Sequence, residues 1–137
     1  LLAMVASCAS EDAEGSRSDA LTQGDAASVE ALSWTEIYER VLVPNECVGC
    51  HGKAAELDLS VEHGYENLVG EVAKGDKCAP TGMQRVDPGH PEASILLDKL
   101  RDVPISGAPM PIGPGAGKVS AEHVELVCAW IAQGAQP

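Results

Sequence analysis

The sequence predicts an all-α domain, a bundle of about four short helices joined by long irregular loops. Apolar residues recur at helical spacing in four segments, and no segment alternates polar and apolar residues over the length of a strand. Residues 102–119 hold four prolines and four glycines, which predicts a stiff, irregular loop. A loop of that length inside a small domain usually has a function.

The first predicted helix begins after Ser33. Ser33 and Glu36 have the spacing of a capping box, in which the side chain of each residue accepts from the backbone amide of the other. Apolar residues follow at helical spacing: Trp34, Ile37, Tyr38 and Val41. Pro44 ends the run because proline lacks the amide hydrogen that a helix needs.

Three more segments have helical patterns. A short helix is expected over 61–69, and a third opens at Pro91, a residue favoured at the first helical position. The fourth follows Ser120 and runs to about Gln133, where Gly134 stops it. One apolar stripe lies along this last helix: Val124, Val127, Cys128 and Ile131.

The composition suggests a core that lacks bulk. With 137 residues the chain can form one domain and a tail, but it has two Trp, two Tyr and no Phe. A large apolar cofactor would fill that deficit. The formal net charge of -12 excludes the basic footprint of a nucleic-acid-binding protein. It favours solubility and, equally, a protein partner with a basic docking patch.

The N-terminal region is expected to anchor the domain. Residues 1–8 resemble the end of a signal peptide, and the Val-Ala-Ser-Cys that closes at Cys8 is similar to a bacterial lipoprotein box. Residues 9–32 are rich in small and acidic residues and are predicted to form a flexible tether, which leaves 33–137 as the folded domain. These features predict a periplasmic or outer-envelope protein, held at the membrane by lipid on Cys8 alone.

The sequence Cys47-Val48-Gly49-Cys50-His51 carries the chemistry. Cys-x-x-Cys-His is a haem attachment signal, because cysteines three apart on a helical turn present both sulfurs to one porphyrin edge. The following histidine then lies under the ring, where a nitrogen can bind iron. A zinc site would need further ligands nearby, a thioredoxin-like pair would need a βαβ unit, and a purely structural use of the two cysteines is the third alternative.

Cys78 and Cys128 remain once the anchor and the haem thioethers are assigned. In an oxidising compartment a leftover pair is expected to form a disulfide. This one would close a loop of 51 residues, worth about 4 kcal/mol on the chain-entropy model. The alternative is that Cys128 is a small buried apolar residue with a free thiol.

Several segments together resemble a known family, the class I bacterial cytochromes c. They are the haem motif, Val86-Asp87-Pro88-Gly89-His90-Pro91-Glu92-Ala93-Ser94, Met110-Pro111 and Ala129-Trp130-Ile131-Ala132-Gln133-Gly134-Ala135. They are similar to single-haem domains common in myxobacterial and planctomycete-type genomes. The resemblance covers residues 33–135 and implies one covalent haem c with His51 and Met110 as axial ligands. It also implies an electron carrier rather than an enzyme, alone or within a larger oxidoreductase complex.

Met110 lies between Pro109 and Pro111, which restrict the backbone on both sides and suit a thioether held near iron. The alternatives are Met110 as a packing residue, Met83 as the ligand, or His90 in a bis-histidine centre. His63, His90 and His123 each stand alone near a helix start or turn, which favours surface or capping roles.

Two other classes of function stay open at this point. One is a haem enzyme or gas sensor, which needs a displaceable sixth ligand. The other is a binding module without haem that uses its cysteines structurally. The Cys78–Cys128 pair and the long 70–90 segment depart from the family pattern.

Overall fold

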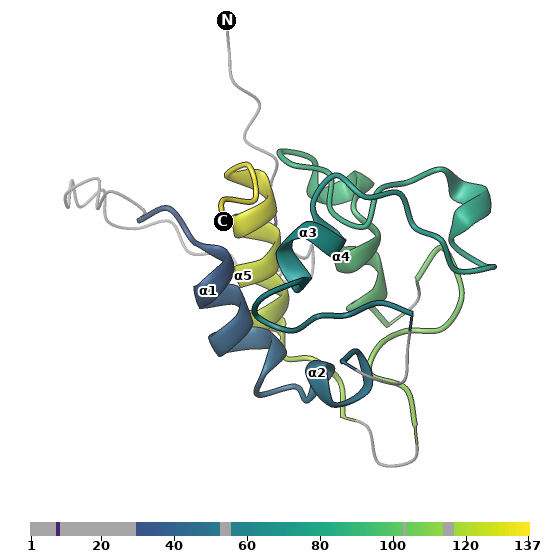
Figure 1. The fold of residues 1–137 in the computed structure, drawn as a ribbon, viewed down its shortest axis with the longest axis horizontal. Helices are drawn as coiled ribbons and strands as arrows, with labels where there is room; N and C mark the ends of the chain where they lie inside the picture. The colour runs from purple at the N-terminus through teal and green to yellow at the C-terminus, as the bar shows by residue number, and fades with distance from the viewer. Residues whose placement is uncertain (1–7, 9–29, 53–55, 103, 114–116) are drawn as a thin grey trace, which may run out of the picture.

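The computed structural model describes residue 8 and residues 30–52, 56–102, 104–113 and 117–137. The elements in chain order are α1 (Trp34–Ile37), η1 (Tyr38–Leu42), α2 (Cys47–Cys50), α3 (Gly64–Leu68), η2 (Ala79–Thr81), η3 (Pro91–Ala93), α4 (Ile95–Lys99) and α5 (Ala121–Ala132). Helices and long loops make up this part of the chain (Figure 1). It contains isolated β-bridges but no β-strand. The prediction of an all-α domain is confirmed.

The predicted capping box at the start of the first helix is confirmed. The Ser33 hydroxyl caps α1 by accepting from the Glu36 amide, and the Ser33 amide donates to the Glu36 carboxylate at 2.9 Å. The helix continues into the π-helical turn η1, where the Val43 amide donates to Tyr38 O at 2.9 Å. Just before α1, the Leu32 amide donates to the Gln133 side chain at 2.8 Å, so the folded domain already begins at the last residue of the predicted tether.

The first and last helices, α1 and α5, lie side by side (Figure 1). The aromatic residues gather around their contact. The Trp34 ring lies 6.0 Å from the Trp130 ring, 6.1 Å from Tyr38 and 6.4 Å from Tyr65, measured between centroids. Offset aromatic contacts of this kind add to the burial of apolar area. All four Trp and Tyr side chains of the chain therefore lie on α1, η1, α3 and α5.

Close packing brings α3 against this cluster. Gly64 opens the helix, and a Cβ placed on it would lie 2.5 Å from Cζ2 of Trp34 and 3.1 Å from the Leu59 carbonyl carbon. No side chain fits in that space, so glycine is required for the approach. The predicted helix over 61–69 is shorter in the structure but stands in the expected place.

The helix predicted from Pro91 is interrupted. Pro91 does open a 3-10 turn, but Ser94 has φ -101° and ψ 120°, and α4 starts only after it. The buried Ser94 hydroxyl accepts from the Asp87 amide at 2.9 Å and donates to His90 O at 2.9 Å. The Ser94 hydroxyl therefore stabilises the turn before it, and the helix is broken at Ser94 instead of continuing from Pro91.

Buried apolar side chains form two clusters, and α4 contributes to both. Leu97 and Leu100 belong to the larger cluster, together with Cys128 and the buried residues of α1 and α5. Ile95 belongs to the smaller cluster, with Ala73 and Cys78, and Met83 packs against it. Cys78 and Cys128 thus lie in different clusters.

The predicted Cys78–Cys128 disulfide is wrong. Cys128 is bonded to Cys8, with 5.9 Å between the two α-carbons, and Cys78 is a free thiol. The Cys78 Sγ lies 2.9 Å from Oγ of Ser106 instead. The chain-entropy model estimates how much a disulfide stabilises the protein from the length of the loop it closes. It does not say which cysteines lie close enough to bond.

Cys8 consequently has a second possible role. A sulfur in a disulfide cannot also carry a lipid thioether, so the predicted anchor and this bond exclude each other in one molecule. The rest of the predicted signal-peptide end (1–7) and most of the tether (9–29) lie outside the described residues. No helix in the described part of the chain is long and apolar enough to cross a bilayer.

Candidate haem-attachment site

The attachment motif forms a single helical turn, α2, entered by a sharp bend. Glu46 precedes it with φ +56°, in the left-handed region that non-glycine residues seldom adopt. The Gly49 amide donates to Glu46 O at 3.1 Å, and the His51 amide donates to Cys47 O at 2.9 Å. Residues 47 and 50 therefore stand one turn apart, and His51 ends the helix as its C-cap.

Both motif cysteines are free thiols, and they differ in environment. Cys47 is half-buried against the larger core cluster, whereas Cys50 is exposed. Burial raises the pKa of the Cys47 thiol, and the neighbouring Cys50 charge raises the same pKa further. The turn thus presents one thiol at the edge of the core and one in solvent.

The backbone of His51 is held by a hydrogen bond, and one nitrogen of its ring lacks a hydrogen-bond partner among the described residues. Its carbonyl accepts from the amide of the buried Leu59 at 2.6 Å. Its Nδ1 is buried and has no hydrogen-bond partner among the described residues. Buried polar atoms are nearly always paired, and an unpaired one needs an explanation. A bond to a metal ion would satisfy this nitrogen, so the residues present fit a haem.

His123 on α5 contacts Asn45, two residues before α2 begins. This contact was not predicted from the sequence. His123 Nδ1 lies 3.0 Å from Nδ2 of Asn45, and the same amide group donates to Val41 O at 2.7 Å. Asn45 thereby joins the end of η1 to the first turn of α5. The pairing of Asn45 with an α5 residue 78 positions away has no local sequence signal.

Met110 lies in the irregular loop that follows α4. Its side chain is half-buried and its amide donates to Lys99 O at 2.7 Å, which fixes the loop to the end of that helix. In the view of Figure 1 this green loop and α2 occupy the same end of the molecule. No hydrogen bond or apolar cluster of the described residues joins Met110 to the motif, and its ligand role stays a prediction.

The competing ligands have other surroundings. Met83 packs in the smaller cluster with Cys78, and the exposed His90 ring lies 3.4 Å from Glu92. His63 stands at the N-cap position of α3, although its side chain makes no capping hydrogen bond. Surface positions for His63 and His90 agree with the predicted surface or capping roles.

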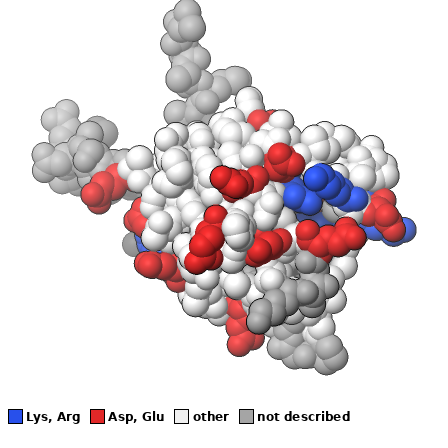
Figure 2. Space-filling model, in the orientation of Figure 1, with Lys and Arg blue, Asp and Glu red and all other residues white. Residues whose placement is uncertain are grey.

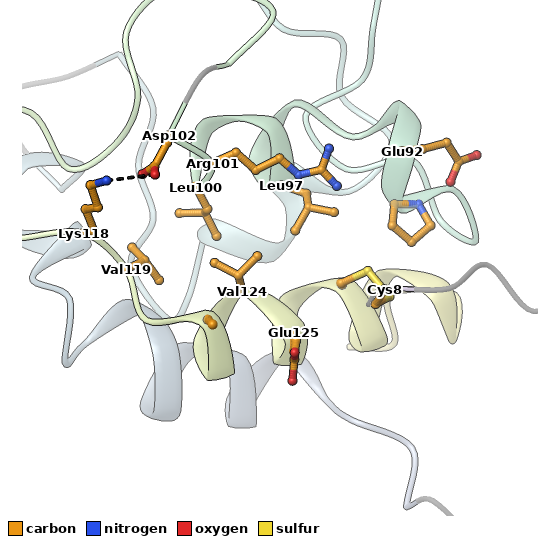
Figure 3. A pocket seen from close by; sticks show the side chains of 13 residues that line it. Cys8, Glu92, Leu97, Leu100, Arg101, Asp102, Lys118, Val119, Val124 and Glu125 are labelled. Atoms are coloured by element: carbon orange, nitrogen blue, oxygen red, sulfur yellow. Dashed lines mark hydrogen bonds and ion pairs between the residues drawn. A yellow bond between two sulfur atoms is a disulfide. The ribbon is translucent and has the colours of Figure 1, made fainter. Parts of the chain in front are cut away.

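A cavity of about 500 Å³ lies apart from the motif, between α4 and α5 (Figure 3). Leu97, Leu100 and Val124 point into it from the two helices, and the Cys8–Cys128 disulfide closes one end. At the other end Lys118 pairs with Asp102 at 2.8 Å. Neither the attachment motif nor Met110 lines this cavity.

The described residues contain no group of three or more His, Cys, Asp or Glu side chains placed to hold a metal ion. Haem iron asks less of the protein, since the porphyrin supplies four ligands and the chain supplies only the axial ones. Compared with known proteins, the chain matches no family model, no curated protein and no solved structure.

Proposed function

We propose that this chain is a c-type cytochrome that carries single electrons. The observation that carries the proposal is the turn α2, where two free thiols stand one helical turn apart. A histidine follows directly, and its buried Nδ1 has no hydrogen-bond partner among the described residues. A zinc site would need further ligands and a thioredoxin-like pair would need a βαβ unit, and the described residues provide neither. The cytochrome c fold itself is part of this proposal.

The chain's own residues would have separate tasks. Cys47 and Cys50 would each add their S–H across a haem vinyl group, which forms a thioether and releases nothing. His51 and Met110 would supply the imidazole and thioether that bind iron. When bound, the haem takes up and releases one electron, and an axial methionine raises its potential relative to a second histidine.

The distribution of core residues supports a structural role for the same group. Every aromatic ring is gathered around Trp34, and the buried apolar residues of α4 are aliphatic. The α2 turn and the loop that carries Met110 themselves contain no Phe, Tyr or Trp. A large apolar cofactor attached at α2 would supply that bulk.

A redox partner with a basic docking patch is part of the proposal. Figure 2 shows carboxylates spread across the visible face, with lysine and arginine gathered in a smaller area. Residues 34–137 alone carry fifteen acids and eight bases. Such an excess attracts a positively charged partner and speeds association at low ionic strength.

We also propose a location in the cell envelope. The Cys8–Cys128 disulfide is of the kind that persists in an oxidising compartment. Acylation of Cys8 would place the protein on a membrane and leave Cys128 as a buried thiol. The intact mass of the protein from its native membrane or soluble fraction separates these two states of Cys8.

Covalent attachment is tested on protein made together with haem-maturation enzymes and then denatured. The wild-type chain is expected to keep its haem through denaturation, and Cys47→Ala with Cys50→Ala is expected to lose it. Cys78→Ala is the matched control, because Cys78 is also a free thiol but lies in another cluster. Haem lost from the wild-type chain, or kept by the double variant, would overturn the proposal.

A further inference from the structure

We infer that Asp98 and Lys99, at the end of α4, position Met110 as an iron ligand by clamping the loop that carries it. The inference rests on the proposed function and concerns how the sixth ligand is held. Neither residue would touch the iron, so both are positioning residues. Together they bind backbone groups of residues 105, 106, 108 and 110.

Lys99 makes three of these contacts. Its ammonium group donates to the carbonyls of Ser106 and Ala108, the latter at 3.1 Å, and its own carbonyl accepts from the Met110 amide at 2.7 Å. Hydrogen bonds from a charged donor are stronger than those between neutral groups. One residue thus holds the loop at two points before Met110 and at Met110 itself.

Asp98 fixes the beginning of the same loop. Its carboxylate is only 6% exposed, and both oxygens accept from the Ile105 amide, at 2.9 and 3.1 Å. A buried carboxylate is costly unless it is hydrogen-bonded. The Ile105 side chain itself is 76% exposed, so it adds little apolar burial to hold this part of the loop in place.

Gly107 allows the loop to close around the ammonium group. It has φ +63°, and a Cβ placed on it would lie 2.8 Å from Nζ of Lys99 and 3.3 Å from Cβ of Lys77. A side chain at this position would be strained by the backbone angle and would press on the ammonium. Nearby, Ser106 is buried and in contact with the Cys78 thiol.

The clamp acts on the ligand by ordering the loop in advance. A methionine on a free loop would lose backbone entropy on binding iron, whereas this loop has already lost it. Without the clamp, the iron–sulfur bond should open more often. A competing ligand from solution should then bind more tightly, although the residues lost contact neither ligand nor iron.

The test measures imidazole binding to the ferric, haem-loaded full chain. Lys99→Ala should raise the apparent affinity for imidazole roughly tenfold, because two hydrogen bonds from a charged donor are lost. Gly107→Ala disturbs the same contact without changing the charge and should act in the same direction. The control Lys74→Ala removes an equal charge from an exposed ion pair with Glu71, and it should stay within about twofold of wild type.

Hydrogen exchange gives a readout that does not depend on the iron. The Met110 amide should exchange faster in Lys99→Ala than in wild type, by roughly the same factor as the imidazole affinity rises. If haem-loaded Lys99→Ala and Gly107→Ala both bind imidazole as wild type does, the clamp is refuted and the cytochrome proposal stands. A wild-type chain that takes up no haem would instead refute the proposed function, and this inference with it.

Discussion

Removing the Cys8–Cys128 disulfide should lower the stability of the domain by an amount that follows from the chain length it encloses. The two residues are 120 positions apart. On the chain-entropy model a loop of that size is worth about 5 kcal/mol, and measured disulfides commonly give about 2–4 kcal/mol. With a urea dependence of about 2 kcal/mol per molar, a loss of 3 kcal/mol moves the unfolding midpoint by about 1.5 M.

Cys8→Ser is the suitable perturbation, because Cys8 is only half-buried, whereas a change at Cys128 would also disturb the core. Unfolding is measured in urea on the haem-loaded, non-acylated full chain, with the iron kept ferrous throughout, in the presence and absence of a thiol reductant. Wild type should lose stability when the disulfide is reduced. Cys8→Ser should have the stability of reduced wild type and should not respond to the thiol reductant. Cys78→Ser should respond as wild type does.

Two results would refute this reasoning. One is a wild-type midpoint that reductant leaves unchanged. The other is a non-reduced digest in which the Cys128 peptide is joined to the Cys78 peptide, which would restore the pairing expected from the sequence.

Three further predictions concern the core and the site. Gly64→Ala should destabilise the domain by about 1–3 kcal/mol through overpacking against Trp34; a neutral effect in urea unfolding would contradict the close approach of α3. In protein without haem, Cys50 should be alkylated faster than Cys47 near neutral pH, because the raised pKa of Cys47 leaves less thiolate. The gap should narrow as pH rises through the pKa of Cys47, and equal rates at neutral pH would speak against it. Met110→Ala should abolish the weak sulfur-to-iron band of the oxidised protein and lower its potential; if both survive, another residue is the ligand.

Local signals predicted the helices well. Ser33 and Ser120 mark helix starts in the sequence because their side chains act on amides three residues away. Pro91 and Gly134 have equally local effects on the backbone, and both stand where the sequence indicated. The break at Ser94 was missed because its hydroxyl closes a turn with Asp87, a contact outside the helical pattern.

Long-range contacts account for what could not be predicted at the site. The Cys-x-x-Cys-His turn is contiguous in sequence and was recognised as a unit. The partner of Cys128 and the pairing of Asn45 with His123 depend on which elements meet in space. The same holds for Lys99, which has the features of an ordinary surface lysine in the sequence and takes its role from the fold of a loop seven to nine residues away.

The visible absorption spectrum of the reduced protein, made with haem-maturation enzymes and recorded before and after addition of carbon monoxide, tests the central claim most directly. An electron carrier whose iron is bound by His51 and Met110 should show the sharp bands of a six-coordinate haem c. Those bands should disappear on oxidation, return on reduction, and stay unchanged in carbon monoxide. A spectrum without haem bands would contradict the cytochrome, and bands that shift at once with carbon monoxide would identify an open sixth position and a haem enzyme or gas sensor instead.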